Sequence, residues 1–213
     1  MISRIALELK SHIPFTALGA VTGIIIMVII VFANVSPQIS QATFHTLHPL
    51  HVILSALTTT AMYMRYSKGK LWVAILIGYA GSIGIATLSD AVIPYLGGAL
   101  LNIEMEFHMP FIEKWWLVNP AALIGIAIGY WKHTTKVPHS GHVLLSTWAS
   151  LFYFTAFGIA NWIPLLPLIF VFLFLAVWLP CCLSDIVFPL LFARQVATPK
   201  EITYNNQHHS VGG

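Results

Sequence analysis

Charged side chains are scarce in this chain. Asp, Glu, Lys and Arg make up 8% of its 213 residues, whereas they form about a quarter of an ordinary soluble domain. Hydrophobic residues reach 58%, and the mean hydropathy is +0.83. This composition excludes an ordinary soluble domain. The sequence therefore predicts an integral membrane protein surrounded by membrane lipid.

Cysteine is rare, and the motifs of several common chemistries are missing. The two cysteines are adjacent, at Cys181 and Cys182, which makes a structural disulfide framework improbable. The sequence contains no Gly-rich phosphate loop, dinucleotide-binding fingerprint, G-x-S-x-G segment or H-E-x-x-H segment. Nucleotide-driven pumping and serine hydrolysis therefore have no support in local motifs.

Long apolar runs dominate what is present. A membrane-spanning helix needs about 20 mainly apolar residues. The stretches that qualify cover residues 13–34, 44–64, 71–90, 116–131, 142–161 and 163–192. We therefore expect an all-α integral membrane fold with six transmembrane helices.

The placement of basic residues predicts the orientation of these helices. Loops rich in Lys and Arg stay on the cytoplasmic side of a membrane. Nine of the ten basic residues fall on one side of the six-span arrangement, and only Lys114 falls on the other. Both termini are then cytoplasmic, and the net charge of +3 reflects membrane topology, with no nucleic acid as partner. We expect the protein in the cytoplasmic (inner) membrane of a prokaryote.

Two polar motifs each occur twice. The segment HPLHVILS, which begins at His48, recurs as HSGHVLLS at His139, and LSDAVIPYL, which contains Asp90, recurs as LSDIVFPLL around Asp185. The copies are offset by 91 residues at the histidines and by 95 at the aspartates. Two nearly equal offsets indicate one duplicated unit.

The duplication predicts the organisation of the chain. Each copy holds three spans, and an odd number of spans inverts the second copy relative to the first. We expect a first three-helix repeat at residues 1–97, an extracytoplasmic acidic loop at 98–115, a second inverted repeat at 116–193 and a disordered cytoplasmic tail at 194–213. The two polar clusters should then face opposite sides of the membrane.

The repeated residues have the chemistry of a metal site. Histidines three residues apart are neighbours on one face of a helix, and a carboxylate from the next helix completes a set that suits zinc or non-haem iron. An ionisable residue inside a membrane is itself a functional candidate. The candidate ligands are His48, His51 and Asp90 for an outward site, and His139, His142 and Asp185 for an inward site.

Residues outside the repeats offer further ligands. Glu106 and His108 lie in the acidic loop beside the predicted outward site, and His12 enters the first span at the depth of the inward site. Ser89 is next to Asp90 and is expected to orient that acid by hydrogen bonding. Glu106, His108 and His12 complete the predicted metal-binding set.

The remaining histidines and cysteines have plainer interpretations. We interpret His45 and His133 as interfacial packing residues. Cys181 and Cys182 offer soft ligands for zinc or copper, but buried cysteine commonly behaves as a small apolar residue. We therefore interpret both cysteines as packing residues.

Three functions are compatible with this sequence. The first is a membrane carrier of a divalent transition metal, with zinc as the first choice and iron or manganese as alternatives. The second is a membrane-embedded zinc-dependent hydrolase of a lipid or peptide, with Glu106 as its general base. The third is a proton-coupled carrier of an organic solute. The expected partners are a metal ion and membrane lipid, and a homo-oligomer is compatible with each reading.

Overall fold

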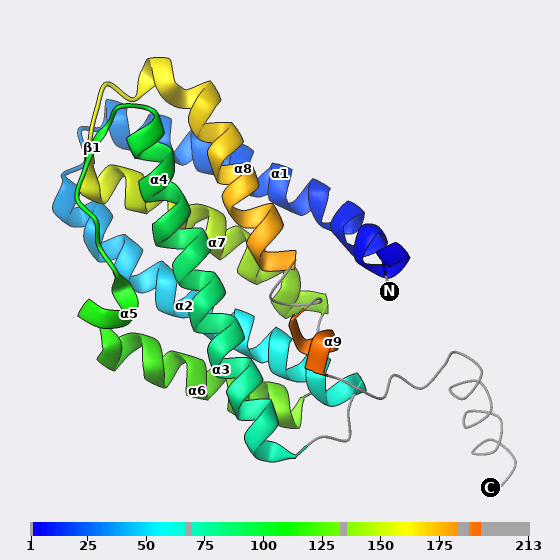
Figure 1. Ribbon diagram of the computed structural model, residues 1–213. Coiled ribbons are helices and arrows are strands. Elements are labelled where there is room, and N and C mark those ends of the chain that lie inside the picture. The colour runs from blue at the N-terminus through cyan, green and yellow to red at the C-terminus, as the bar shows by residue number, and fades with distance from the viewer. Residues whose placement is uncertain (1, 67–69, 133–135, 183–187, 193–213) are drawn as a thin grey trace, which may run out of the picture.

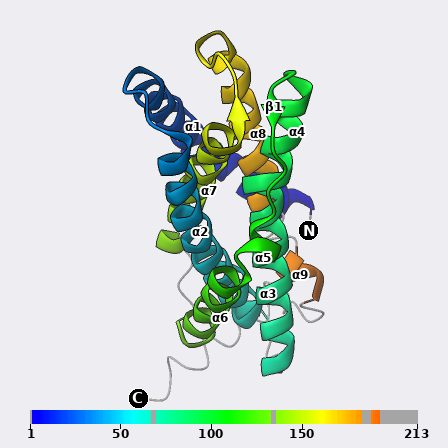
Figure 2. The same cartoon turned by 90° about the vertical axis from the view of Figure 1, so that its left-hand side faces the viewer.

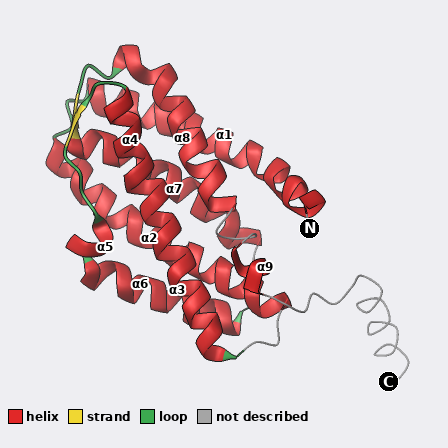
Figure 3. Ribbon diagram, viewed as in Figure 1, coloured by secondary structure: helices red, strands yellow, loops and turns green. Residues whose placement is uncertain are grey.

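The computed structural model of this protein describes residues 2–66, 70–132, 136–182 and 188–192, and most of them are helical (Figure 3). The elements in chain order are α1 (Ile2–Phe32), α2 (Pro37–Tyr66), α3 (Leu71–Thr87), the π-helical turn η1 (Leu88–Val92), α4 (Ile93–Leu100), β1 (Glu104–Met105), α5 (Pro110–Glu113), α6 (Trp115–Trp131), α7 (Lys136–Phe157), β2 (Gly158–Ile159), the 3-10 turn η2 (Ile163–Leu165), α8 (Leu166–Cys182) and α9 (Phe188–Phe192). The strands β1 and β2 form one short antiparallel pair.

Three helical segments are long and apolar enough to cross a membrane. They cover Ile13–Phe32, Leu71–Leu100 and Ile163–Cys181. Large apolar side chains project outward from them. On α1, exposed side chains three or four residues apart form a stripe at Leu18, Val21, Ile25 and Ile29. An apolar stripe on the outside of a helix suits contact with lipid chains, so the structure supports a helical membrane protein.

The two helices α2 and α7 lie at the centre of the bundle and carry its buried polar residues. Helix α2 packs against α7, α6 and α3, and helix α7 also packs against α1 and α8. The buried hydroxyl residues of α2 and α7 include Ser55, Thr58, Thr59, Thr60, Ser146, Thr147 and Ser150. Figure 2 shows the continuous helix of α3 and α4 standing on one side of this central pair. The polar residues lower the hydropathy of α2 and α7, so neither belongs to the three apolar segments.

The helix ends gather at two opposite ends of the bundle. In Figure 1 the start of α1, the end of α2, the start of α3 and the start of α7 lie toward the lower right. The end of α4, strand β1 and the start of α8 lie toward the upper left. Arg65 lies in the last turn of α2, Lys70 precedes α3 and Lys132 follows α6. These basic residues therefore share one end of the bundle.

The helix that carries Asp90 is longer than the sequence predicted. We expected a span that ends at Asp90, but α3, η1 and α4 run on as one helical segment to Leu100. Pro94 has no N–H to donate to the carbonyl of Asp90 four residues earlier, and the wider π turn η1 occurs at this place, where Ile93 N–H donates to the carbonyl of Leu88. Such π turns are frequent at functional sites. Asp90 consequently lies inside the helix and not at its end.

Asparagines terminate two helices at the same end of the bundle. Asn102 has φ = 54° and follows α4, and Asn34 has φ = 51° and follows α1. After Asn102, the N–H of Ile103 donates to the carbonyl of Gly98 at 2.9 Å. This is a Schellman motif, in which a left-handed residue turns the chain back on the last helical carbonyls.

Other helix ends also differ from the predicted spans. Helix α2 begins at Pro37, seven residues before the predicted start at 44, and α7 ends at Phe157, four residues before the predicted end at 161. Helix α7 ends early because the next two residues pair with β1. This pairing ties the loop after α4 to the end of α7.

Glycines on α6 allow it to approach α2 closely. A Cβ added at Gly125 would clash with the carbonyl oxygen of Ile53, and one added at Gly129 would clash with the carbonyl oxygen of Leu57. Small residues four apart let helix backbones touch. By contrast, a Cβ added at Gly84 would meet nothing within 4 Å.

Replacing Gly125 with alanine should destabilise the protein. The new methyl group forces the α2 and α6 backbones apart, and overpacking of this kind costs about 1–3 kcal/mol. Thermal unfolding in detergent would measure the loss. Gly84→Ala is the matched control and should leave the unfolding temperature unchanged or slightly raised. Equal unfolding temperatures for the two variants would contradict the packing described above.

Candidate metal centre

The carboxylate of Asp90 is the hub of a buried polar network. Its Oδ2 accepts hydrogen bonds from Nδ1 of His48 at 2.9 Å and Nδ1 of His51 at 2.7 Å. Its Oδ1 accepts from the hydroxyls of Ser89 at 2.7 Å and Ser146 at 2.8 Å. All five side chains are buried. The four donors come from α2, η1 and α7, so one carboxylate joins both copies of the duplicated unit.

The same network determines which nitrogen of each imidazole offers a lone pair. An ionised carboxylate only accepts hydrogen bonds, so Nδ1 of His48 and of His51 must carry the hydrogen. The lone pair then lies on Nε2 of each ring. Both Nε2 atoms are buried and have no hydrogen-bond partner among the described residues. An unsatisfied buried polar atom costs about 1–3 kcal/mol, so each Nε2 lies where a ligand would be stabilised.

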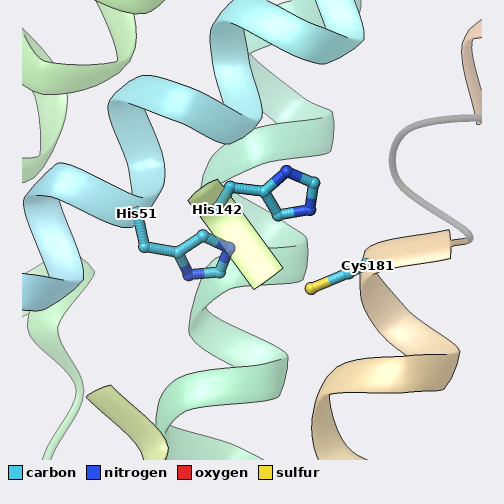
Figure 4. A group of neighbouring side chains, drawn as sticks. All are labelled: His51, His142 and Cys181. Atoms are coloured by element: carbon cyan, nitrogen blue, oxygen red, sulfur yellow. The ribbon is translucent and has the colours of Figure 1, made fainter. Parts of the chain in front are cut away.

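His51 belongs to a group of three side chains from three helices. His51 lies on α2, His142 on α7 and Cys181 near the end of α8, and one ligand atom of each lies within 4.8 Å of the other two. The imidazoles of His51 and His142 stack with centroids 5.7 Å apart and an interplanar angle of 9°. Figure 4 shows the sulfur of Cys181 directed toward the two rings. We call these three residues the buried centre.

The buried centre has the chemistry of a zinc or copper(I) site. Imidazole nitrogen and thiolate sulfur are the ligands that these ions favour, whereas manganese prefers oxygen. Ligand atoms around a tetrahedral zinc ion lie about 3.3–3.8 Å apart, given bonds of about 2.0–2.3 Å. If the distances between these ligand atoms shortened by about 1 Å, the three side chains could therefore bind one ion. Asp90 orients His51 through its second nitrogen, an arrangement that metal-bound histidines commonly have.

The structure brings together some of the predicted ligands. The expected contact of His48 and His51 with Asp90 is present, and Ser89 donates to that acid as predicted. The two clusters were expected to face opposite sides of the membrane, and the ring of His142 stacks on His51 of the other copy. Asp90 is already surrounded by four donors, so it positions histidines and is a poor direct ligand.

Three predicted ligands lie outside the part of the chain that the structure describes. These are the side chains of His12 and His139, and the whole of Asp185. Their part in a metal site remains a prediction.

The loop residues divide into an exposed and a buried one. Glu106 is exposed, and its backbone N–H donates to the carbonyl of Phe157 at 2.9 Å. His108 is buried, its ring stacks on Phe157 with centroids 4.5 Å apart, and its Nδ1 pairs with a carboxylate oxygen of Glu113. Burial lowers the pKa of His108 below its ordinary value, and it outweighs the opposing effect of Glu113. The ring is therefore neutral near pH 7.

Sequence reasoning underrated three residues of this region. Cys181 was interpreted as a packing residue but lies in the buried centre. Ser146 ends the second repeated segment just as Ser55 ends the first, and this repetition was the available signal for the role of Ser146. His45 was interpreted as an interfacial residue, yet its ring lies 5.0 Å from that of His108. Nothing in the sequence marks the last contact, because it joins a helix to a distant loop.

Replacing Asp90 with asparagine should strongly destabilise the protein. The change removes the charge that four buried donors share, and breaking a buried charged network costs about 3–5 kcal/mol. Ser146→Ala removes one of the four hydrogen bonds and should cost about 1–2 kcal/mol. Thermal unfolding in detergent would measure both losses.

Ser82→Ala is the matched control for Ser146→Ala. Ser82 is equally buried, but among the described residues its hydroxyl makes only a long contact of 3.4 Å with a backbone carbonyl. Its loss should therefore be small. If Ser146→Ala and Asp90→Asn destabilise no more than Ser82→Ala, the network does not hold the bundle together.

The chain matches no protein-family model, no curated protein and no solved structure. The buried centre and the Asp90 network are therefore the basis on which its function is argued.

Proposed function

We propose that this protein is a membrane carrier of a divalent transition metal ion, with zinc as the first choice. The observation that carries the proposal is the buried centre, where His51, His142 and Cys181 converge from three helices with ligand atoms within 4.8 Å. A thiolate and two imidazoles favour zinc over manganese. Binding releases the proton of the Cys181 thiol, which couples metal occupancy to protons.

The location of the centre supports transport. In carriers built from inverted repeats, ion sites lie near the membrane midplane where the repeats meet, beside interrupted helices. His51 belongs to the first repeated segment and His142 to the second. The π turn at Asp90 widens one neighbouring helix without breaking it, and Pro180 lies next to Cys181 in another. These features favour a site that both halves of the chain can open.

We also propose that the chain crosses the membrane six times. Beyond the three long apolar segments, Trp115–Trp131 is apolar but short, and α2 and α7 have lengths of 30 and 22 residues. A polar interior in α2 and α7 is what a carrier needs, because other helices shield these two from lipid. The alternation of helix ends in Figure 1 fits two inverted three-helix repeats.

Zinc uptake into liposomes that contain the purified protein tests the carrier. We expect uptake that a chelator abolishes and that His51→Ala or His142→Ala lowers at least tenfold, because even the hydrogen-bonding partners of metal ligands contribute about 10–100-fold to affinity. Gly84→Ala is the control for expression and insertion. The proposal fails if wild-type protein carries no stoichiometric transition metal and both histidine variants leave the flux unchanged.

Cobalt(II) in place of zinc tests the ligand set directly. Wild-type protein should show thiolate-to-cobalt charge-transfer absorption, since the thiolate is the metal-binding form of cysteine. Cys181→Ser should abolish this absorption. In protein that remains folded, Asp90→Asn should keep the absorption but require about 10–100-fold more cobalt, because Asp90 acts through His51. Absorption that persists in Cys181→Ser would remove the cysteine from the site.

One observation favours a zinc-dependent membrane hydrolase as the second candidate. The buried centre has three protein ligands, and catalytic zinc sites keep a fourth position open for water. A hydrolase also needs a general base, and Glu106, the expected base, is exposed on the loop whereas the centre is buried. Chelator-sensitive hydrolysis of a lipid or peptide without zinc flux would favour this candidate over the carrier.

A further inference from the structure

We infer that His45 and His108 form a second binding position for the same divalent transition metal ion, at the loop end of the bundle, from which the ion passes to the buried centre. This inference rests on the proposed function because it concerns the route to the same site. We call these two residues the outer histidine pair. Neither residue makes a contact that the Asp90 network needs.

The outer histidine pair joins two elements far apart in the sequence. His45 lies on α2 and His108 in the loop before α5, and their rings lie 5.0 Å apart at an interplanar angle of 61°. The Nε2 atoms of both rings are buried and have no hydrogen-bond partner within the described part of the chain. Two buried ring nitrogens without a hydrogen-bond partner among the described residues thus belong to neighbouring rings from different elements.

His108 repeats the arrangement seen at His51. Its Nδ1 pairs with the carboxylate of Glu113, just as Nδ1 of His51 pairs with Asp90. In both places a carboxylate takes the first ring nitrogen and leaves Nε2 for a ligand, as in metal-bound histidines. Glu113 thus positions His108.

Histidines on α2 connect the outer pair with the buried centre. His45, His48 and His51 follow one another at intervals of three residues and so lie along one side of the helix. His48 stands between the other two and also has a buried Nε2 without a hydrogen-bond partner in residues 2–66, 70–132, 136–182 and 188–192. Four such nitrogens, those of His45, His48, His51 and His108, therefore extend from the loop to the centre.

A packing role alone does not explain these four nitrogens. Aromatic rings surround them, with Phe44 stacked on His48 at 5.5 Å and Phe157 stacked on His108 at 4.5 Å. Each unsatisfied nitrogen in such surroundings costs about 1–3 kcal/mol, and native proteins leave few of them. A metal ion that moves from one lone pair to the next would recover this cost.

The charge of the loop favours entry of a cation at the outer histidine pair. Glu104 and Glu106 are exposed, and the side chain of Glu113 is 45% exposed. Acidic groups at the mouth of a site raise the local concentration of cations. Lys114 is the loop's one basic residue in sequence, and its Nζ lies 5.3 Å from the ring centroid of Trp116. Its charge still acts on His108, whose pKa burial lowers and Lys114 lowers further, and so it opposes part of the attraction that these carboxylates exert.

His108→Gln and His45→Gln test the inference in the full-length protein, with zinc as the probe. Each variant should raise the zinc concentration for half-maximal uptake by about tenfold or more, because a ligand contributes at least as much as its hydrogen-bonding partner. Bound zinc should fall from two ions per chain to one. The thiolate-to-cobalt absorption of the buried centre should stay unchanged, since Cys181 is untouched. Glu113→Gln should give a smaller increase, and Gly84→Ala is the control.

The loop also has backbone hydrogen bonds that both substitutions leave in place. The backbone N–H of His108 donates to the hydroxyl of Tyr153 at 2.9 Å, and that of Glu106 to the carbonyl of Phe157. An unchanged unfolding temperature would verify this. Half-saturation and stoichiometry that match wild type in both glutamine variants would overturn the inference while leaving the carrier intact.

A failure of the proposed function has a different signature. Wild-type protein without zinc flux and without thiolate-to-cobalt absorption would remove the carrier and the buried centre. Zinc binding alone then tests whether the outer histidine pair holds an ion. His51→Ala should still bind one zinc ion, and the added His108→Gln change should abolish that binding. If the doubly substituted protein still binds zinc, the inference that the outer histidine pair binds the ion is overturned.

Discussion

The buried carboxylate of Asp90 is the constraint on which the rest of the structure depends. A charge in an apolar bundle is stable only where hydrogen bonds replace its lost hydration. Asp90 accepts from His48 and His51 on α2 and from Ser146 on α7. These donors must reach one point, so the rotations of both central helices are set by a single residue.

The need to shield this network explains the layout of the bundle. Buried hydroxyls and imidazoles occupy α2 and α7, and the more apolar helices pack around them. The glycines of α6 let its backbone touch that of α2, which closes the bundle tightly on that side. The long apolar segments meanwhile expose stripes of large side chains, which suit contact with lipid.

Histidine recurs in this interior in one chemical arrangement. In His48, His51 and His108 a carboxylate takes Nδ1, and Nε2 is left toward other buried groups. The carboxylate determines which ring nitrogen carries the hydrogen, and so it fixes the tautomer of each histidine. Asp90 and Glu113 thus position their histidines, which leaves ring nitrogens and the Cys181 sulfur as the candidate ligands.

Much of the site could be predicted from the sequence, because its signals are local or repeated. Two histidines three residues apart share a helix face whatever the fold, and duplication paired them with Asp90. The neighbouring Ser89 was predicted to bind that acid and does so. The position of Asp90 within its helix was predicted wrongly, because an apolar pattern does not show that a π turn lets a helix continue past Pro94.

By itself the sequence determined the helical, membrane-compatible character of the chain and the association of Asp90 with the first histidine pair. Composition and short-range spacing carry this information. Only the tertiary structure decided that His142 stacks on His51, that Cys181 joins them and that His108 reaches His45. Each of these contacts joins segments far apart in the sequence, and it depends on how helices rotate and cross when they pack, which no local pattern records.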